Sequence, residues 1–264
     1  MRSIDPHVHM IWMKGPDIER MSMGGVEAAV QPTPHALPWI VSGSTLLRMW
    51  DDFLDYWVSY CQVRGVDLYT TLGVPFTGVD AEGVKDGLKQ LPKYLDNKRV
   101  VGIGEIGLNQ GTEDEIKLFK AQLNIAKEHN LPIIVHTPTP REPQGPPIVN
   151  QIIKIISKEN FPMERVVLDH TGKSTLEIRL KTKAMVALSV CYDKNTPDDA
   201  AKIVLENPGK RDRLFINSEL GYDREGYFSV PRVVLAMRLL GLDKKEIEKV
   251  VWVNPKKFFN LPVK

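Results

Sequence analysis

The chain has 264 residues, of which 42% are hydrophobic and 26% are charged. This is the composition of an ordinary globular protein, and it excludes the collagen-like and low-complexity classes. The 35 basic and 33 acidic residues leave a net charge of +2, which argues against a strongly cationic nucleic-acid-binding protein but allows a local basic patch.

The two cysteines, Cys61 and Cys191, are too few and too far apart to indicate a disulfide framework or a cysteine-based zinc site. The N-terminus shows no basic segment followed by an apolar run, and no stretch of 18 uninterrupted apolar residues is present. We therefore expect a cytoplasmic protein with no membrane partner. The sequence leaves the oligomeric state open.

Eight short apolar segments with strand-like composition alternate with stretches of helical periodicity. These segments are residues 4–9, 26–31, 68–73, 100–105, 132–136, 166–170, 185–190 and 214–219. Such alternation predicts a parallel sheet with helical crossovers, and eight repeats predict a (β/α)₈ TIM barrel in a single domain over residues 1–264. A doubly wound open sheet is the rival fold, although no Gly-x-Gly-x-x-Gly forms a strand-to-helix turn.

The helical stretch after residue 44 carries apolar side chains at three- and four-residue spacing. They are Leu46, Trp50, Phe53, Trp57 and Cys61. This spacing predicts an amphipathic helix whose two tryptophans belong to the core rather than to a recognition surface.

Six metal-ligating side chains fall at or near the ends of these apolar strands. They are His7, His9, Glu105, His136, His170 and Glu219. His7 and His9 are two residues apart, so a strand turns both side chains to the same face. In a barrel the C-terminal ends of the strands converge on one mouth, where the active sites of this fold lie.

Each of these residues alone has a plainer explanation, as a polar side chain that ends a strand. Asp223 also lies close enough to Glu219 to replace it. Together they predict a metal site. Six ligands exceed the needs of one tetrahedral zinc, so we expect two divalent ions bridged by Glu105, with zinc first and manganese, iron, nickel or magnesium as alternatives. A metal pair about 3.5–4 Å apart can hold a bridging hydroxide and clamp a substrate oxygen, which predicts hydrolysis.

Four motifs in strand order resemble the TatD-related metal-dependent hydrolases of the amidohydrolase superfamily. They are Ile4-Asp5-Pro6-His7-Val8-His9, the Gly-Glu-Ile-Gly-Leu-Asn run at 104–109, His136, and His170-Thr171-Gly172. The resemblance implies that His7, His9 and Glu105 hold one ion, and that Glu105, His136 and His170 hold the second.

Two positions depart from the pattern of that family. Relatives end strand eight in Glu-Thr-Asp, whose aspartate ligates metal and assists the attacking water, whereas this chain has Asn217-Ser218-Glu219. Many relatives read Gly-x-His-Pro after strand three, where this chain has Gly73-Val74-Pro75 without a histidine.

Five further residues are secondary candidates. Asp5 is a candidate acceptor beneath the metals, with a backbone-bonded carboxylate as its alternative. His35 follows strand two, and is either a residue of the mouth or a plain loop histidine. Arg141, Lys173 and Arg224 follow strands five, six and eight, where an anionic substrate would need cations.

These observations predict a hydrolase in which Glu105 and Glu219 are catalytic and Glu219 accepts the proton. The TatD resemblance implies phosphoester hydrolysis at nucleic-acid ends, as in a deoxyribonuclease. A small-molecule ester, amide or lactone hydrolase is the alternative, and a metal-binding but catalytically idle barrel is a third.

Overall fold

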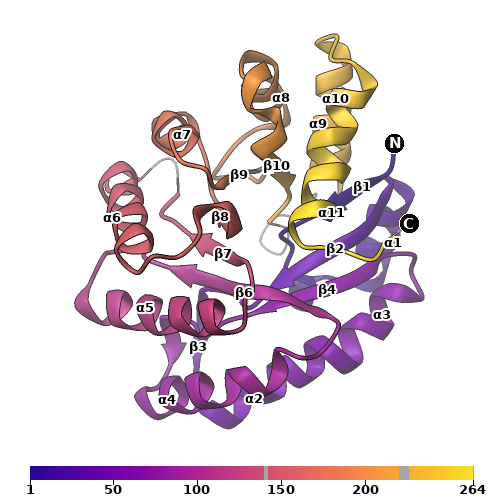
Figure 1. Ribbon diagram of the computed structural model, residues 1–264. Coiled ribbons are helices and arrows are strands. Elements are labelled where there is room, and N and C mark those ends of the chain that lie inside the picture. Colours follow the sequence, from indigo (N-terminus) through magenta and orange to yellow (C-terminus); the bar gives the residue numbers. More distant parts are fainter. Residues whose placement is uncertain (140–141, 220–225, 264) are drawn as a thin grey trace.

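The fold is seen in a computed structural model that describes residues 1–139, 142–219 and 226–263 (Figure 1). In this part of the chain, eight parallel strands form one sheet in the order β1-β2-β4-β6-β7-β8-β9-β10. The strands are β1 (Ser3–Asp5), β2 (Val26–Pro32), β4 (Asp67–Leu72), β6 (Val100–Gly107), β7 (Ile133–His136), β8 (Val166–Leu168), β9 (Met185–Ser189) and β10 (Leu214–Asn217).

The first and last strands of the sheet approach each other beyond their C-terminal ends. The backbone N–H of Glu219 donates to the carbonyl of His7 at 2.9 Å, and the N–H of Ser218 donates to the Asp5 carboxylate at 3.1 Å. These bonds bring the sheet to a nearly closed barrel, so the predicted (β/α)₈ architecture is confirmed.

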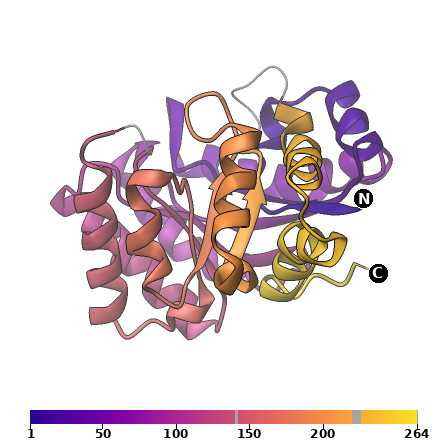
Figure 2. The same cartoon turned by 90° about the horizontal axis from the view of Figure 1, so that it is seen from above.

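Helices connect the strands and surround them (Figures 1 and 2). They are α1 (Gly15–Met23), α2 (Gly43–Asp52), α3 (Val58–Gln62), α4 (Ala81–Gln90), α5 (Glu113–Glu128), α6 (Gly145–Lys158), α7 (Lys173–Leu180), α8 (Pro197–Glu206), α9 (Ser229–Leu239), α10 (Lys244–Glu248) and α11 (Asn254–Phe258). Wide π-helical turns at Phe53–Trp57 and Lys249–Val253 join α2 to α3 and α10 to α11. Throughout the described residues, no helix has the combined length and apolar character that a bilayer crossing requires.

Two short strands, β3 (Ala36–Val41) and β5 (Thr77–Val79), form a separate parallel pair that the sequence did not predict. They extend the loops that follow β2 and β4. Each is too short and too irregular in pattern to be recognised without its partner, because the ladder between them joins residues about 40 positions apart in sequence.

The barrel interior is filled by alternate side chains of the strands. Ile4, Val30, Ile134, Val167 and Phe215 come from five different strands and belong to one buried cluster. Outside the strands, Leu46, Trp50 and Phe53 of the predicted amphipathic helix are fully buried. The core thus fills the barrel below the mouth and leaves the polar strand ends above it.

β1 and β8 are shorter than predicted, so His7, His9 and His170 follow their strands rather than end them. The N–H of Val8 nevertheless donates to Val30 of β2 at 3.0 Å. This bond continues the parallel pairing beyond β1 and keeps His7 and His9 close to each other.

Gly107 allows β6 to pass close to β7. Its φ of +152° lies in the range that favours glycine, and a Cβ added there would lie 2.2 Å from the backbone oxygen of His136. Because the contact is with backbone, no side-chain rotation relieves it.

We predict that Gly107→Ala lowers the free energy of unfolding by about 2 kcal/mol or more, through overpacking and backbone strain. The measurement is urea denaturation. Gly209→Ala is the matched control, since a Cβ at Gly209 meets nothing within 4 Å. Equal midpoints for the two variants would contradict the role given to Gly107.

Candidate metal centre

All six predicted ligands are buried at the C-terminal mouth of the barrel. His7, His9, Glu105, His136, His170 and Glu219 are each at most 4% exposed. They come from segments that lie far apart in sequence, and the closing of the barrel brings them together.

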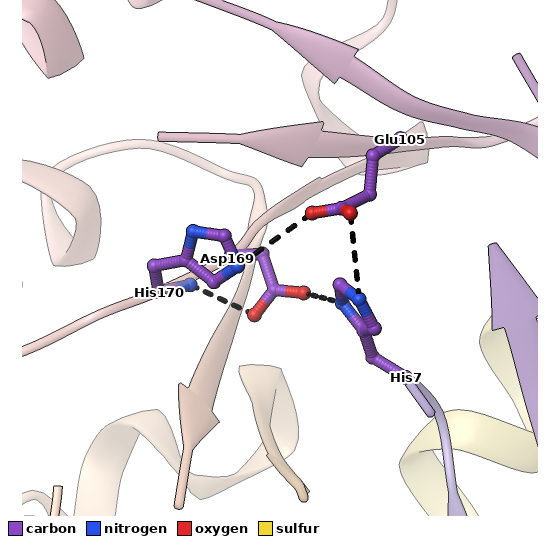
Figure 3. A group of neighbouring side chains, drawn as sticks. All are labelled: His7, Glu105, Asp169 and His170. Atoms are coloured by element: carbon purple, nitrogen blue, oxygen red, sulfur yellow. Dashed lines mark hydrogen bonds and ion pairs between the residues drawn. The ribbon is translucent and has the colours of Figure 1, made fainter. Parts of the chain in front are cut away.

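The Glu105 carboxylate lies at the centre of this group, and its two oxygens face different histidines (Figure 3). Oε2 is 3.6 Å from Nε2 of His7 and 3.8 Å from Nε2 of His9. Oε1 is 3.6 Å from Nδ1 of His136 and 3.6 Å from Nε2 of His170. One carboxylate therefore separates four imidazoles into two pairs.

Glu105 of β6 is held by the residue that follows β2 and, through that residue, by the core. Its backbone N–H donates to the Thr33 carbonyl at 2.9 Å. The Thr33 hydroxyl accepts from Nε1 of buried Trp50 and from the N–H of Gly73, both at 3.1 Å. The packing of α2 thus fixes the backbone from which Glu105 reaches the mouth.

Asp169 is a site residue that sequence reasoning missed. One oxygen hydrogen-bonds Nδ1 of His7. The other accepts from Ser189 at 2.8 Å, from Asn217 at 3.0 Å and from the N–H of His170 at 2.8 Å. Because Nδ1 of His7 is engaged by this carboxylate, Nε2 is the nitrogen directed toward Glu105, as in metal sites where a carboxylate orients a histidine ligand.

Alternation along a strand would place Asp169 and His170 on opposite faces, which is why Asp169 was not predicted. The strand ends before them, however, and His170 adopts φ +60°, in the left-handed region. Nδ1 of His170 hydrogen-bonds the Thr137 carbonyl at 2.7 Å, which makes Nδ1 the protonated nitrogen and directs Nε2 inward.

Fully buried Arg179 of α7 ties together the ends of β7 and β8. Its guanidinium donates to the Thr137 hydroxyl at 2.7 Å and to the Asp169 carbonyl. The hydroxyl in turn donates to the same carbonyl at 2.7 Å. This network fixes the end of β7, which carries His136, and the segment after β8, which carries His170.

The electrostatics of the centre favour a positive charge. Burial disfavours the imidazolium of His7, but the Glu105 and Asp169 carboxylates outweigh burial and raise the pKa of His7 to about 10. Burial and the neighbouring His7 charge lower the pKa of His9 to about 3, and burial lowers the pKa of His136 well below its usual value. A cation that displaces the His7 proton would satisfy the same carboxylates.

Glu219 lies at the far side of His170, with φ +47°. Its Oε1 is 3.2 Å from Nε2 of His170, and both its oxygens are 2.9 Å from Nζ of Lys194. Burial would raise the pKa of Glu219, but these two cationic groups hold it well below its usual value. Lys194 was not predicted, because it follows β9 by five residues and no polar strand end marks it.

His35 lies inside the site rather than in a remote loop. Its ring stacks on His136 with the centroids 3.5 Å apart, and Nδ1 is 3.4 Å from Oε2 of Glu105. Its side chain is 22% exposed. One ligand atom each of His35, Glu105 and His136 lies within 4.8 Å of the others, so His35 is a further candidate ligand on the partly exposed side of the cluster.

The other secondary candidates are placed differently. Asp5 accepts backbone N–H groups from Ser218 and His7, which matches the alternative of a backbone-bonded carboxylate, and burial raises its pKa to about 6. The Lys173 side chain is 74% exposed and pairs with Asp199 at 3.3 Å, not with a residue of the cluster. Arg141, Arg224 and Asp223 lie outside the described residues.

The donor set fits divalent metal ions. Oε1 of Glu105 and both ring nitrogens of His136 are buried and make no hydrogen bond. Buried polar atoms without partners are costly, and neutral imidazoles with carboxylates are the ligands that zinc and related ions accept. A (β/α)₈ barrel with this cluster at its C-terminal mouth defines the class of metal-dependent hydrolases.

Comparison with known proteins shows the family to which the chain belongs. Residues 4–260 match the family described as TatD related DNase, so the chain belongs to that family and the predicted resemblance is confirmed. The chain is 30% identical to an uncharacterized metal-dependent hydrolase of Methanocaldococcus jannaschii, over 98% of this chain and 100% of that protein.

Solved structures share the fold. A TatD-like protein of Archaeoglobus fulgidus matches with a TM-score of 0.78 and 24% identity, over 98% of this chain and 100% of that one. The phosphotriesterase homology protein of Escherichia coli, complexed with phosphate in its active site, matches with a TM-score of 0.71 and 13% identity, over 98% of both chains.

Asp169→Asn tests the support of His7. We predict a loss of metal affinity of about 10- to 100-fold, because the amide removes the charged acceptor that orients the ring. The measurement is metal content after dialysis against graded chelator. Asp5→Asn, which keeps an oxygen acceptor for the same backbone groups, is the control and is expected to retain metal. Equal loss in both variants would argue against an orienting role for Asp169.

Proposed function

We propose that the chain hydrolyses phosphoesters at a binuclear metal centre bridged by Glu105. The observation that carries this proposal is the separation of four imidazoles by one buried carboxylate, with His7 and His9 near one oxygen and His136 and His170 near the other. Each pair with its oxygen supplies three ligands, the number that leaves open positions for water and substrate.

Zinc is the proposed ion because four imidazoles, which are neutral once they bind metal, dominate the ligand set, although manganese, iron, nickel and magnesium remain alternatives. Ions bound here would supply a nucleophile from water at neutral pH and polarise the substrate oxygen. Glu219 is ionised beside His170 and Lys194, and it is the proposed acceptor of the proton from the attacking water. His35 reaches the cluster from a partly exposed position, from which it would contact either the ion held by Glu105 and His136 or the substrate.

Phosphoester hydrolysis is proposed first because the family is that of TatD related DNases and because a structural neighbour holds phosphate in its active site. Hydrolysis of nucleic-acid ends is its specific form. The near-neutral net charge and the missing histidine at Gly73-Val74-Pro75 support a small ester, amide or lactone as the alternative. A cytoplasmic location remains part of the proposal.

We predict that the purified protein binds about two divalent ions per chain, and that Glu105→Gln lowers this number because the amide cannot bridge two cations. Elemental analysis measures the stoichiometry. Chelation is expected to lower the melting temperature, since an ion that binds only the folded state stabilises it by mass action. A single ion, retained by Glu105→Gln, would contradict the bridging role.

We predict that His136→Ala lowers the turnover of phosphoesters by at least about 100-fold, because it removes one ligand of the centre. The measurement is a panel containing phosphodiesters, single-stranded DNA, small esters and lactones. His129→Ala is the matched control, since His129 is exposed at the C-terminus of α5. Salt-dependent DNA binding would support the nuclease form, and no turnover with any divalent ion would favour the idle barrel.

A further inference from the structure

A cationic side chain near the reacting group favours an anionic substrate. The sequence predicts Lys173 for this role, but the structure places a different lysine in the cluster. Lys173, predicted for this role, forms an exposed pair with Asp199. Among the described residues, Lys194 is a lysine whose ammonium enters the cluster, on the loop between β9 and α8. Its side chain is 6% exposed.

The loop that carries Lys194 is firmly held. The Asn195 side chain donates to the carbonyls of Thr171 at 2.7 Å and Ser189 at 3.0 Å, and the next residue, Thr196, caps α8 through the N–H of Asp199 at 3.1 Å. Lys194 therefore projects from a rigid support at the mouth, and the position of its ammonium is set before any ligand binds.

The ammonium has three N–H donors, and its partners do not use them equally. Both oxygens of Glu219 lie 2.9 Å from Nζ, which is normal for a charge-assisted bond. Asp193 Oδ1 lies at 3.4 Å, which is long for such a bond. One of the three donors is thus only weakly satisfied.

The Glu219 carboxylate has a second partner besides Lys194, because Nε2 of His170 lies 3.2 Å from its Oε1. The Lys194 ammonium places a positive charge beside Glu219 and is linked to Glu105 through Glu219 and then His170. That charge is shielded from solvent, so it acts strongly on any charged group that enters the mouth.

We propose that Lys194 binds the charged oxygen of an anionic substrate, a phosphoryl or carboxylate group, while it holds Glu219 in place. This inference rests on the proposed hydrolysis at the same site and narrows it. The centre selects substrates that carry a negative charge at the reacting group over neutral esters and lactones.

The test compares metal-loaded wild-type protein with Lys194→Met, and uses Lys173→Met as a control that removes an equal charge from the surface. Binding of inorganic phosphate is measured by isothermal titration calorimetry, with metal content and melting temperature recorded for each protein. We expect the dissociation constant for phosphate to rise by about 10- to 100-fold in Lys194→Met. This is the change that loss of one hydrogen bond to a charged group produces. The metal content of Lys194→Met is expected to equal that of the wild type. Lys173→Met is expected to bind phosphate as the wild type does.

Kinetics supply the second readout. The ratio of kcat/KM for an anionic phosphodiester, bis(4-nitrophenyl) phosphate, to that for the neutral ester 4-nitrophenyl acetate is expected to fall at least about tenfold in Lys194→Met. If Lys194 had only a structural role, its substitution would lower kcat/KM for both substrates by the same factor. If Lys194→Met does not fold, Lys194→Gln, which keeps a donor without the charge, decides by the same two measurements.

Phosphate binding that is absent in the wild type, or equal in the wild type and the Lys194 variants, overturns the assignment. A failure of the proposed hydrolysis gives a different result. The wild-type protein then binds two ions and phosphate but hydrolyses no ester. In that case the phosphate titration still decides whether Lys194 binds anions.

Discussion

Burial of the Glu105 carboxylate among histidines is the interaction on which the rest of the site depends. A carboxylate without solvent is costly unless cations or donors surround it. Here its two oxygens face four imidazoles, and the packing of Trp50 against Thr33 fixes the backbone that carries it. The arrangement is stable as a set, and it is the reason for our proposal that Glu105 bridges two cations.

A second layer of contacts converts this set into a rigid centre. Asp169 orients His7, and the Thr137 carbonyl orients His170. Arg179 ties the two loops together from below. The left-handed backbone of His170 and Glu219 is unfavourable for residues other than glycine, and such strain persists where surrounding contacts over-determine the conformation, which is common at functional sites.

Charge is distributed unevenly over the mouth. Glu105, Asp169 and Glu219 concentrate negative charge, which raises the pKa of His7 and favours bound cations. Lys194 is placed at the edge of this region, next to Glu219, and His35 covers the opposite edge by stacking on His136. The buried cluster of histidines and carboxylates therefore has Lys194 and His35 as immediate neighbours.

The sequence by itself determined the eight strands and the convergence of His7, His9, Glu105, His136, His170 and Glu219, because strand composition and the C-terminal position of polar residues are local signals. Only the tertiary structure placed Asp169, Lys194 and His35 in the site and Lys173 outside it. Their roles depend on a strand ending two residues earlier than its pattern suggests, and on loops whose course is set by partners distant in sequence. Such contacts leave no periodicity in the chain, so they become visible only when the barrel closes.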